Sequence, residues 1–113
     1  LSEGVQMQIL SAKGRQLRMM VMELPPGATL HGSDGHAHEG EECHFILQGT
    51  VKYAQGEQTA VLRKGDSVHF NGYIHHRVEN FGHSLARILC VTNSSMEHML
   101  EEPDYCDCED EEA

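Results

Sequence analysis

The stretch HAHEGEECHFILQG, residues 36–49, carries the strongest chemical signal in the chain. Side chains two positions apart on an extended strand point to the same side, so His36 and His38 are expected to face one side together. Glu42 follows at the start of an apolar run. Two imidazoles and a carboxylate suit a first-row divalent metal, although histidine pairs with this spacing also occur on exposed strands that bind no metal. The stretch predicts a metal site that takes a further ligand from elsewhere in the chain.

A second stretch, GDSVHFNGYIHHRVEN at residues 65–80, is the natural source of that ligand. The chain turns through Gly65 and Asp66 and then enters a strand pattern that contains His75 and His76. Seven of the nine histidines lie between residues 31 and 76. A histidine is costly to bury without a partner, so a cluster of this size needs a chemical reason, and metal binding supplies one.

The rest of the chain reads as short β-type runs separated by glycine-bearing turns. Eight runs are expected to be strands: residues 5–9, 17–24, 43–48, 51–54, 59–62, 67–70, 76–79 and 85–92. Many short strands at close spacing are typical of an all-β sandwich or barrel. Only residues 94–101 suggest a short turn of helix, capped by Ser94 or Ser95.

The length and the charge distribution of the chain limit its possible domain organisation. The chain has 113 residues, enough for one domain with one core. It carries a net charge of −10, but residues 101–113 hold eight of the 18 acidic residues and no base, which leaves −2 for residues 1–100. We therefore expect a folded domain at 1–100 and an acidic, disordered tail at 101–113. Direct nucleic-acid contact by this segment is not expected, because phosphate binding needs Lys and Arg.

The cysteines and the hydropathy indicate the cellular compartment in which the protein is expected. No apolar run approaches the length of a bilayer span and no signal peptide is evident, so no membrane association is expected. Cys43 and Cys90 sit in apolar runs, where free cysteine behaves as a small hydrophobe. Cys106 and Cys108 form a C-x-C pair that matches no standard zinc or redox motif. Without a disulfide framework, the sequence predicts a cytoplasmic protein.

Both histidine stretches resemble the two sequence motifs of the cupin superfamily. The first motif, G-x5-H-x-H-x3-4-E-x6-G, is met at His36, His38, Glu42 and Gly49, with a displaced leading glycine at Gly27, Gly32 or Gly35. The second, G-x5-P-x-G-x2-H-x3-N, is met at Gly65, His76 and Asn80, with Asn71 in the proline position and Tyr73 in the second glycine position. The resemblance covers residues 5–95. It implies a single-domain, all-β jelly-roll barrel of six to eight strands, the double-stranded β-helix.

The resemblance also implies which residues hold a metal. The ligand set is His36, His38, Glu42 and His76, on a divalent transition metal such as zinc, nickel, iron or manganese. Protonated imidazoles do not bind metal, so the affinity is expected to fall below about pH 6. His44, two residues after Glu42, shares its inward face and is expected to line the ligand cavity, with Tyr53, Tyr73 and His75 near the barrel mouth. His31, His83 and His98 are expected at the surface or in loops.

Phrases such as LRKGDSV at residues 62–68 resemble, more narrowly, the C-terminal sensor cupin of bacterial helix-turn-helix regulators of the xenobiotic-response-element type. This implies a small-molecule sensor module, with Leu1 marking an excised domain or a stand-alone relative. The alternative is a metal-dependent enzyme, such as a dioxygenase, isomerase or lyase acting on a small polar metabolite, with His44, Tyr53 or Tyr73 as acid or base. The resemblance further implies a homodimer, with residues 5–9 and 17–24 as interface strands.

Overall fold

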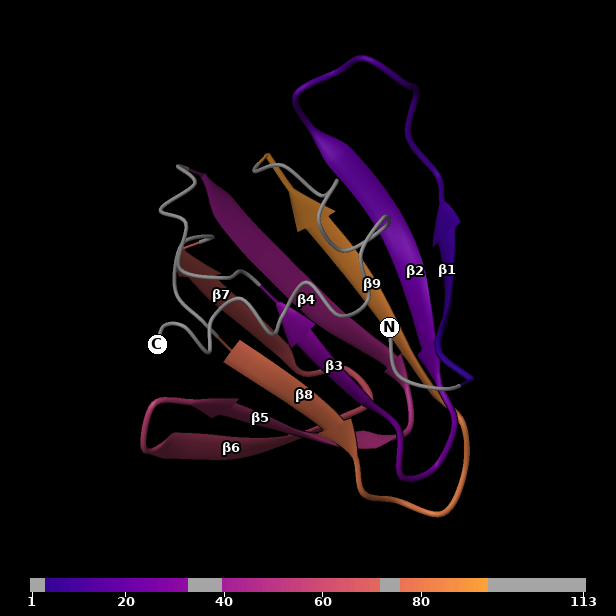
Figure 1. Cartoon of the computed structure of the whole chain (residues 1–113), viewed down its shortest axis with the longest axis vertical. Coiled ribbons are helices and arrows are strands. Elements are labelled where there is room, and N and C mark those ends of the chain that lie inside the picture. The colour runs from indigo at the N-terminus through magenta and orange to yellow at the C-terminus, as the bar shows by residue number, and fades with distance from the viewer. Residues whose placement is uncertain (1–3, 33–39, 72–75, 94–113) are drawn as a thin grey trace.

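The computed structural model describes residues 4–32, 40–71 and 76–93, and these residues form nine β-strands and no helix. The strands are β1 (Gln6–Ile9), β2 (Arg18–Leu24), β3 (Thr29–Gly32), β4 (Glu41–Gln48), β5 (Thr50–Gln55), β6 (Gln58–Arg63), β7 (Ser67–Asn71), β8 (His76–Asn80) and β9 (Ala86–Thr92). Figure 1 shows them as two layers of arrows.

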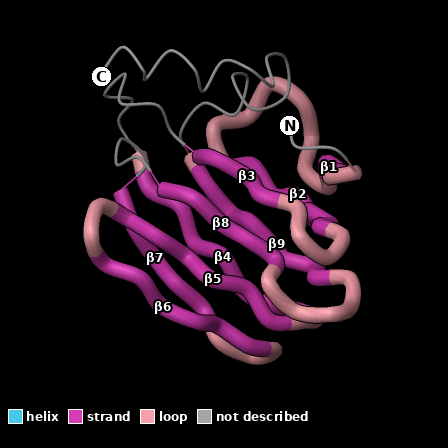
Figure 2. Tube along the Cα trace, turned by 60° about the horizontal axis from the view of Figure 1, so that its bottom comes forward, coloured by secondary structure: helices cyan, strands magenta, loops and turns pink. Residues whose placement is uncertain are grey.

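The two layers are antiparallel sheets with different strand orders. One sheet runs β1-β2-β9-β4-β7 and the other β3-β8-β5-β6 (Figures 1 and 2). Strands that are neighbours in a sheet are mostly distant in sequence, as in the jelly-roll arrangement. The core is formed between the sheets, with Met20, Met22 and Ile88 from the five-stranded sheet and Val51 and Val78 from the four-stranded sheet.

Strict alternation on the central strands decides which side chains enter this core. In β9, every second residue from Ala86 to Thr92 is buried, and in β4 the buried positions include Glu42, His44 and Ile46. Side chains along a strand alternate between its two faces, so a polar residue at an inward position is buried together with the apolar residues of the same face. β4 therefore brings a carboxylate and an imidazole into the interior.

The last residue of each motif, Gly49 in the first and Asn80 in the second, stabilises the barrel and is not a predicted metal ligand. Gly49 joins β4 to β5 at φ +94°, and a Cβ there would lie 2.8 Å from Cα of Ala86, so only glycine fits. Asn80 is fully buried, and its Nδ2 donates to the backbone oxygens of Leu24 (2.8 Å) and Ser84 (2.9 Å). Its Oδ1 accepts from the backbone N–H of Gly82 at 3.0 Å.

The structure confirms the all-β jelly roll and all eight expected strands to within a few residues. It corrects two expectations. The described residues form nine strands rather than six to eight. His31 was expected at the surface or in a loop, and the loop alternative is wrong because His31 lies in β3, which pairs with β8. β3 is four residues long and shows no apolar alternation, so it has no local signal and depends on its pairing with β8. The helix expected at 94–101 and the tail at 101–113 lie outside the described residues.

Candidate metal centre

Two of the four predicted metal ligands lie in the described residues, and both are buried. Glu42 is near the start of β4 and is 4% exposed, and His76 is the first residue of β8 and is 3% exposed. β4 and β8 belong to opposite sheets, so the two side chains enter the barrel from its two walls. His36 and His38 lie outside the described residues, as do Tyr73 and His75.

His44 lies between Glu42 and Tyr53 and contacts both. Its Nε2 is 3.0 Å from Oε1 of Glu42, and its Nδ1 is 2.6 Å from the Tyr53 hydroxyl. His44 is 2% exposed, so these contacts are shielded from water. The predicted pocket residues His44 and Tyr53 thus form one hydrogen-bonded chain with the predicted ligand Glu42.

The charge state of Glu42 results from opposed effects. Burial raises the pKa of its carboxyl, but the hydrogen bond from His44, with the electrostatic effects of the nearby His44 and His76 imidazoles, outweighs burial and lowers the pKa below its usual value of 4.5. Glu42 is therefore a carboxylate at neutral pH. Burial raises the pKa of Tyr53 well above its usual value, with further contributions from the charges of Cys90 and Glu42, so the phenol stays protonated.

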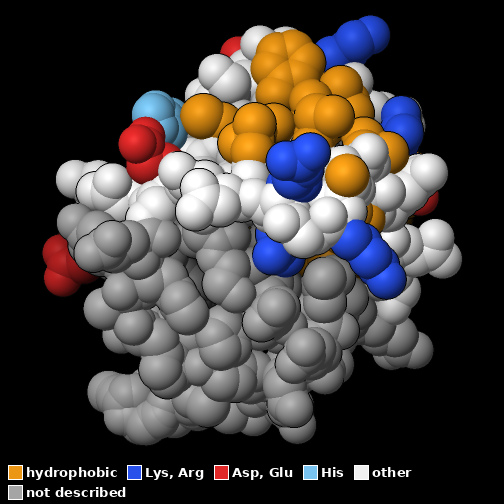
Figure 3. Space-filling view, turned by 90° about the horizontal axis from the view of Figure 1, so that it is seen from above, with side chains coloured by type: hydrophobic (Ala, Val, Ile, Leu, Met, Phe, Trp, Pro, Cys, Tyr) orange, Lys and Arg blue, Asp and Glu red, His pale blue; other side chains and the backbone are white. Residues whose placement is uncertain are grey.

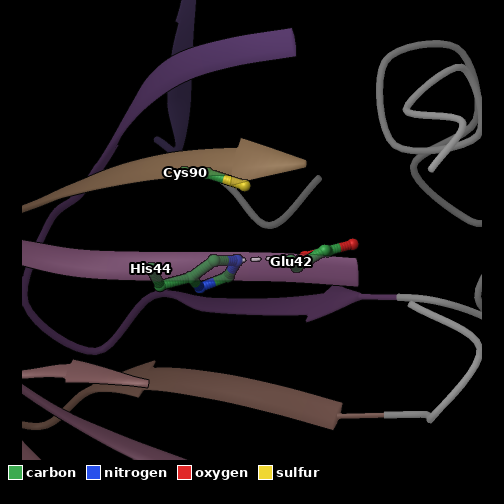
Figure 4. Close-up of side chains that lie close together, drawn as sticks. All are labelled: Glu42, His44 and Cys90. Carbon is green, nitrogen blue, oxygen red and sulfur yellow. Dashed lines mark hydrogen bonds and ion pairs between the residues drawn. The ribbon is translucent and has the colours of Figure 1, made fainter. Parts of the chain in front are cut away.

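Cys90 is a neighbour of this cluster that the sequence did not reveal as part of a site. It lies opposite His44 in the β4–β9 pairing, and one ligand atom each from Glu42, His44 and Cys90 lie within 4.8 Å of one another. Figure 4 shows the three side chains on the two neighbouring strands. In the sequence, Cys90 lies in an apolar run, and this identifies it only as a small hydrophobic residue.

The imidazole of His76 packs against two other rings. Its centroid is 5.9 Å from that of His44 and 4.2 Å from that of Phe70. His44 also contacts Phe70 edge-on at 5.1 Å. These contacts restrict both imidazoles, so the polar groups are held by packing as well as by hydrogen bonds.

The cupin domain family matches residues 20–92, which is more than half of the chain. The chain belongs to the cupin family. No curated protein matches the sequence of this cupin. Within the part of the chain that the structure describes, no helix is long and apolar enough to cross a membrane.

Solved structures share the fold of this cupin. A predicted oxalate decarboxylase from Thermotoga maritima is 26% identical with a TM-score of 0.66, and the match covers 78% of each chain. The cupin domain of an XRE family transcriptional regulator from Enterobacter cloacae is 15% identical with a TM-score of 0.71, covering 80% of this chain and 96% of that one. An HTH_3 family transcriptional regulator from Vibrio cholerae is 20% identical with a TM-score of 0.67, covering 78% of this chain and 49% of the regulator.

The residues of this cupin fit a bound metal at Glu42. Oε1 of Glu42 bonds to His44, whereas Oε2 has no hydrogen-bond donor among the described residues and points away from His44 (Figure 4). A buried carboxylate oxygen is costly unless a donor, a water or a cation satisfies it. Cys90 fits a metal less well than Glu42, because a thiol must lose its proton to bind metal. Burial raises the pKa of the Cys90 thiol, and the nearby negative charges raise it further.

A cavity of about 130 Å³ lies beside this cluster. Its wall includes Tyr53 and His76, together with Ala54, Gln55, Gln58, Thr59, Ala60, Val68 and Phe70. His44 is not a wall residue, but its Nδ1 bonds to the hydroxyl of Tyr53, which is one. The cavity is lined by β5, β6 and β8 of the four-stranded sheet and by β7 of the five-stranded sheet, and β6 and β7 are each an edge strand. One predicted ligand and one predicted pocket residue therefore face the same space.

Proposed function

We propose that this cupin binds a divalent transition metal through His36, His38, Glu42 and His76, and a small polar molecule beside it, as the sensor module of a transcriptional regulator. One observation carries the proposal: Glu42 and His76 enter the barrel from opposite sheets, and His76 also forms part of the cavity wall. A molecule in the cavity would contact a ligand of the metal.

Three imidazoles and a carboxylate would fill four positions on a cation that accepts five or six, leaving one or two for the small molecule. The bound metal would supply a positive charge and a coordination position for an oxygen or nitrogen of that molecule. Iron, zinc, nickel and manganese all accept this ligand set, because mixed nitrogen and oxygen ligands do not discriminate sharply among them.

The size of the cavity limits the small molecule. A cavity of about 150 Å³ holds benzene, so about 130 Å³ admits a molecule of about six non-hydrogen atoms. The described residues of the wall include no Lys, Arg, Asp or Glu, and their polar groups are the amides of Gln55 and Gln58, two hydroxyls and one imidazole. The exposed wall is mostly apolar, so these few groups suit a compact molecule that has apolar surface as well as polar atoms for hydrogen bonds, with any negative charge met by the metal.

The regulator role rests on the resemblance of residues 62–68 and their surroundings to sensor cupins. It is supported by the fold shared with the cupin domain of the Enterobacter cloacae regulator. A sensor acts only through a difference in ligand affinity between two states.

A metal-dependent enzyme is the second candidate, favoured by the 26% identity to the predicted oxalate decarboxylase. Tyr53, a residue of the cavity wall whose phenol stays protonated, is the best placed proton donor for such a reaction.

A homodimer is part of the proposal, and the outer face of the five-stranded sheet is its expected interface. Two cross-strand rows of this face are largely apolar, Met19–Val91–Cys43 and Val21–Leu89–Phe45. Figure 3 shows hydrophobic side chains gathered on one side of the molecule with Lys and Arg side chains around them. Exposed apolar patches of this kind often mark protein contacts.

Ligand binding without conversion separates the sensor from the enzyme. The metal-loaded protein is incubated with small polar acids, amides and alcohols of about six non-hydrogen atoms, and thermal stabilisation and the chemical identity of each compound are measured. A sensor is stabilised by a compound that is recovered unchanged, whereas formation of a product supports the enzyme. Replacement of Ala60 by Phe fills the cavity and should abolish the stabilisation, while Val61→Leu, at an outward position of β6, should preserve it.

A further inference from the structure

The chain Tyr53–His44–Glu42 connects the cavity wall to a predicted metal ligand through both nitrogens of one imidazole. We infer that His44 is a positioning residue, which donates from Nε2 to Oε1 of Glu42 and accepts at Nδ1 from the Tyr53 hydroxyl, and so holds Oε2 of Glu42 toward the metal. The link to the metal rests on the proposed function. The direction of the hydrogen bonds does not.

The direction follows from the groups at the two ends. A carboxylate only accepts, so Nε2 of His44 must carry the proton of that bond. A neutral imidazole has one N–H, which leaves Nδ1 as an acceptor, and the Tyr53 hydroxyl must then donate to it. His44 is the only hydrogen-bond partner of Tyr53 among the residues that the structure describes, so this direction satisfies the phenol proton.

This arrangement separates His44 from the metal ligands. Both of its nitrogens are engaged, at 2.6 and 3.0 Å, and to bind a metal it would have to give up one of these bonds inside a buried site. Edge contacts with the rings of Tyr53 (5.5 Å) and Phe70 (5.1 Å) fix the ring plane. Glu42, His44 and Cys90 are close enough to share an ion, but only Glu42 has a free ligand atom of the right charge state.

Two measurements test the inference. In the metal-free protein, the ¹⁵N chemical shifts of His44 should report a protonated Nε2 and an unprotonated Nδ1. A protonated Nδ1, in either the other tautomer or the imidazolium, would overturn the inferred direction. This readout needs no metal, so it remains decisive if the wild-type protein binds none, a result that would defeat the proposed function instead.

In the second measurement, Co²⁺ binding is titrated for three variants. His44→Phe should weaken binding about 10- to 100-fold, the usual effect of losing a residue that orients a ligand. His44→Gln, whose amide N–H can still reach Glu42, should recover most of the loss, and Tyr53→Phe should weaken binding less than His44→Phe. The visible spectrum of bound Co²⁺ should be the same in all, with no thiolate charge-transfer band.

Two results would contradict the positioning role. Unchanged Co²⁺ affinity in His44→Phe would show that Glu42 needs no orienting partner. A changed Co²⁺ spectrum in that variant would make His44 itself a ligand. If His44→Phe fails to fold, Tyr53→Phe carries the comparison of affinity and His44→Gln carries the comparison of the spectrum.

Discussion

Replacement of the buried Asn80 by Ala should destabilise the barrel strongly without touching the metal ligands. The side chain makes three hydrogen bonds, at 2.8, 2.9 and 3.0 Å, to backbone groups of Leu24, Ser84 and Gly82. Each such bond contributes about 1 kcal/mol, so the free energy of unfolding should fall by about 3 kcal/mol. The fall is measured by urea denaturation of the metal-free protein, with an unchanged m-value.

Two further variants make this prediction specific. Asn80→Asp keeps the volume but replaces the donor that serves two carbonyls, so it should cost about as much as Asn80→Ala. Asn93→Ala removes one exposed bond, from the backbone N–H of Glu41 at 2.8 Å, and should cost about 1 kcal/mol or less. If Asn80→Ala costs no more than Asn93→Ala, the role assigned to Asn80 is wrong.

Three other variants and conditions test the fold, the buried thiol and the outer face. Gly49→Ala should cost clearly more than Gly14→Ala in urea denaturation, because both have positive φ but only the Gly49 Cβ meets backbone; equal costs would refute the steric argument. Burial raises the pKa of Cys90 above its usual value of 9.0, so the stability of the metal-free protein should be full below that pH and fall by about 1.4 kcal/mol per pH unit just above it. Cys90→Ala should flatten this slope below pH 10.0, the usual pKa of tyrosine, above which the raised pKa of Tyr53 adds a loss of the same sign. An equally steep slope below that pH would contradict the assignment. Phe45→Glu, on the outer face, should yield a monomer in light scattering, and a persistent dimer would place the interface elsewhere.

Most of the strand pattern follows from the sequence because the signal is local. The two-residue period of a strand is enough to put Glu42 and His44 on one face. Which face points inward does not follow from hydrophobicity, because Cys43 and Phe45 are exposed on the opposite face of β4. β3 had no such signal, because a four-residue strand acquires its conformation from the β8 strand that it pairs with. His69 of β7 lies on the outer face, where its Nε2 is 2.5 Å from Oε1 of Glu41, a contact that depends on the pairing of β4 with β7.

The candidate site is predictable in part for the same reason. Glu42 and His76 follow from motif spacing, but their convergence depends on how two sheets close over one another. The proximity of Cys90 to His44 depends on the register between β4 and β9, which no local pattern specifies. Nor does the sequence reveal that both nitrogens of His44 are engaged, since that depends on Tyr53 in the opposite sheet.

The metal content of purified, unheated protein tests the central claim most directly. Elemental analysis should find one equivalent of a divalent transition metal per chain in the wild type, and little in His36→Ala or His76→Ala. His69→Ala removes an exposed histidine from the outer face and should retain the metal, as a matched control. A wild type without metal under these conditions, or His36→Ala and His76→Ala variants with undiminished metal, would contradict the account.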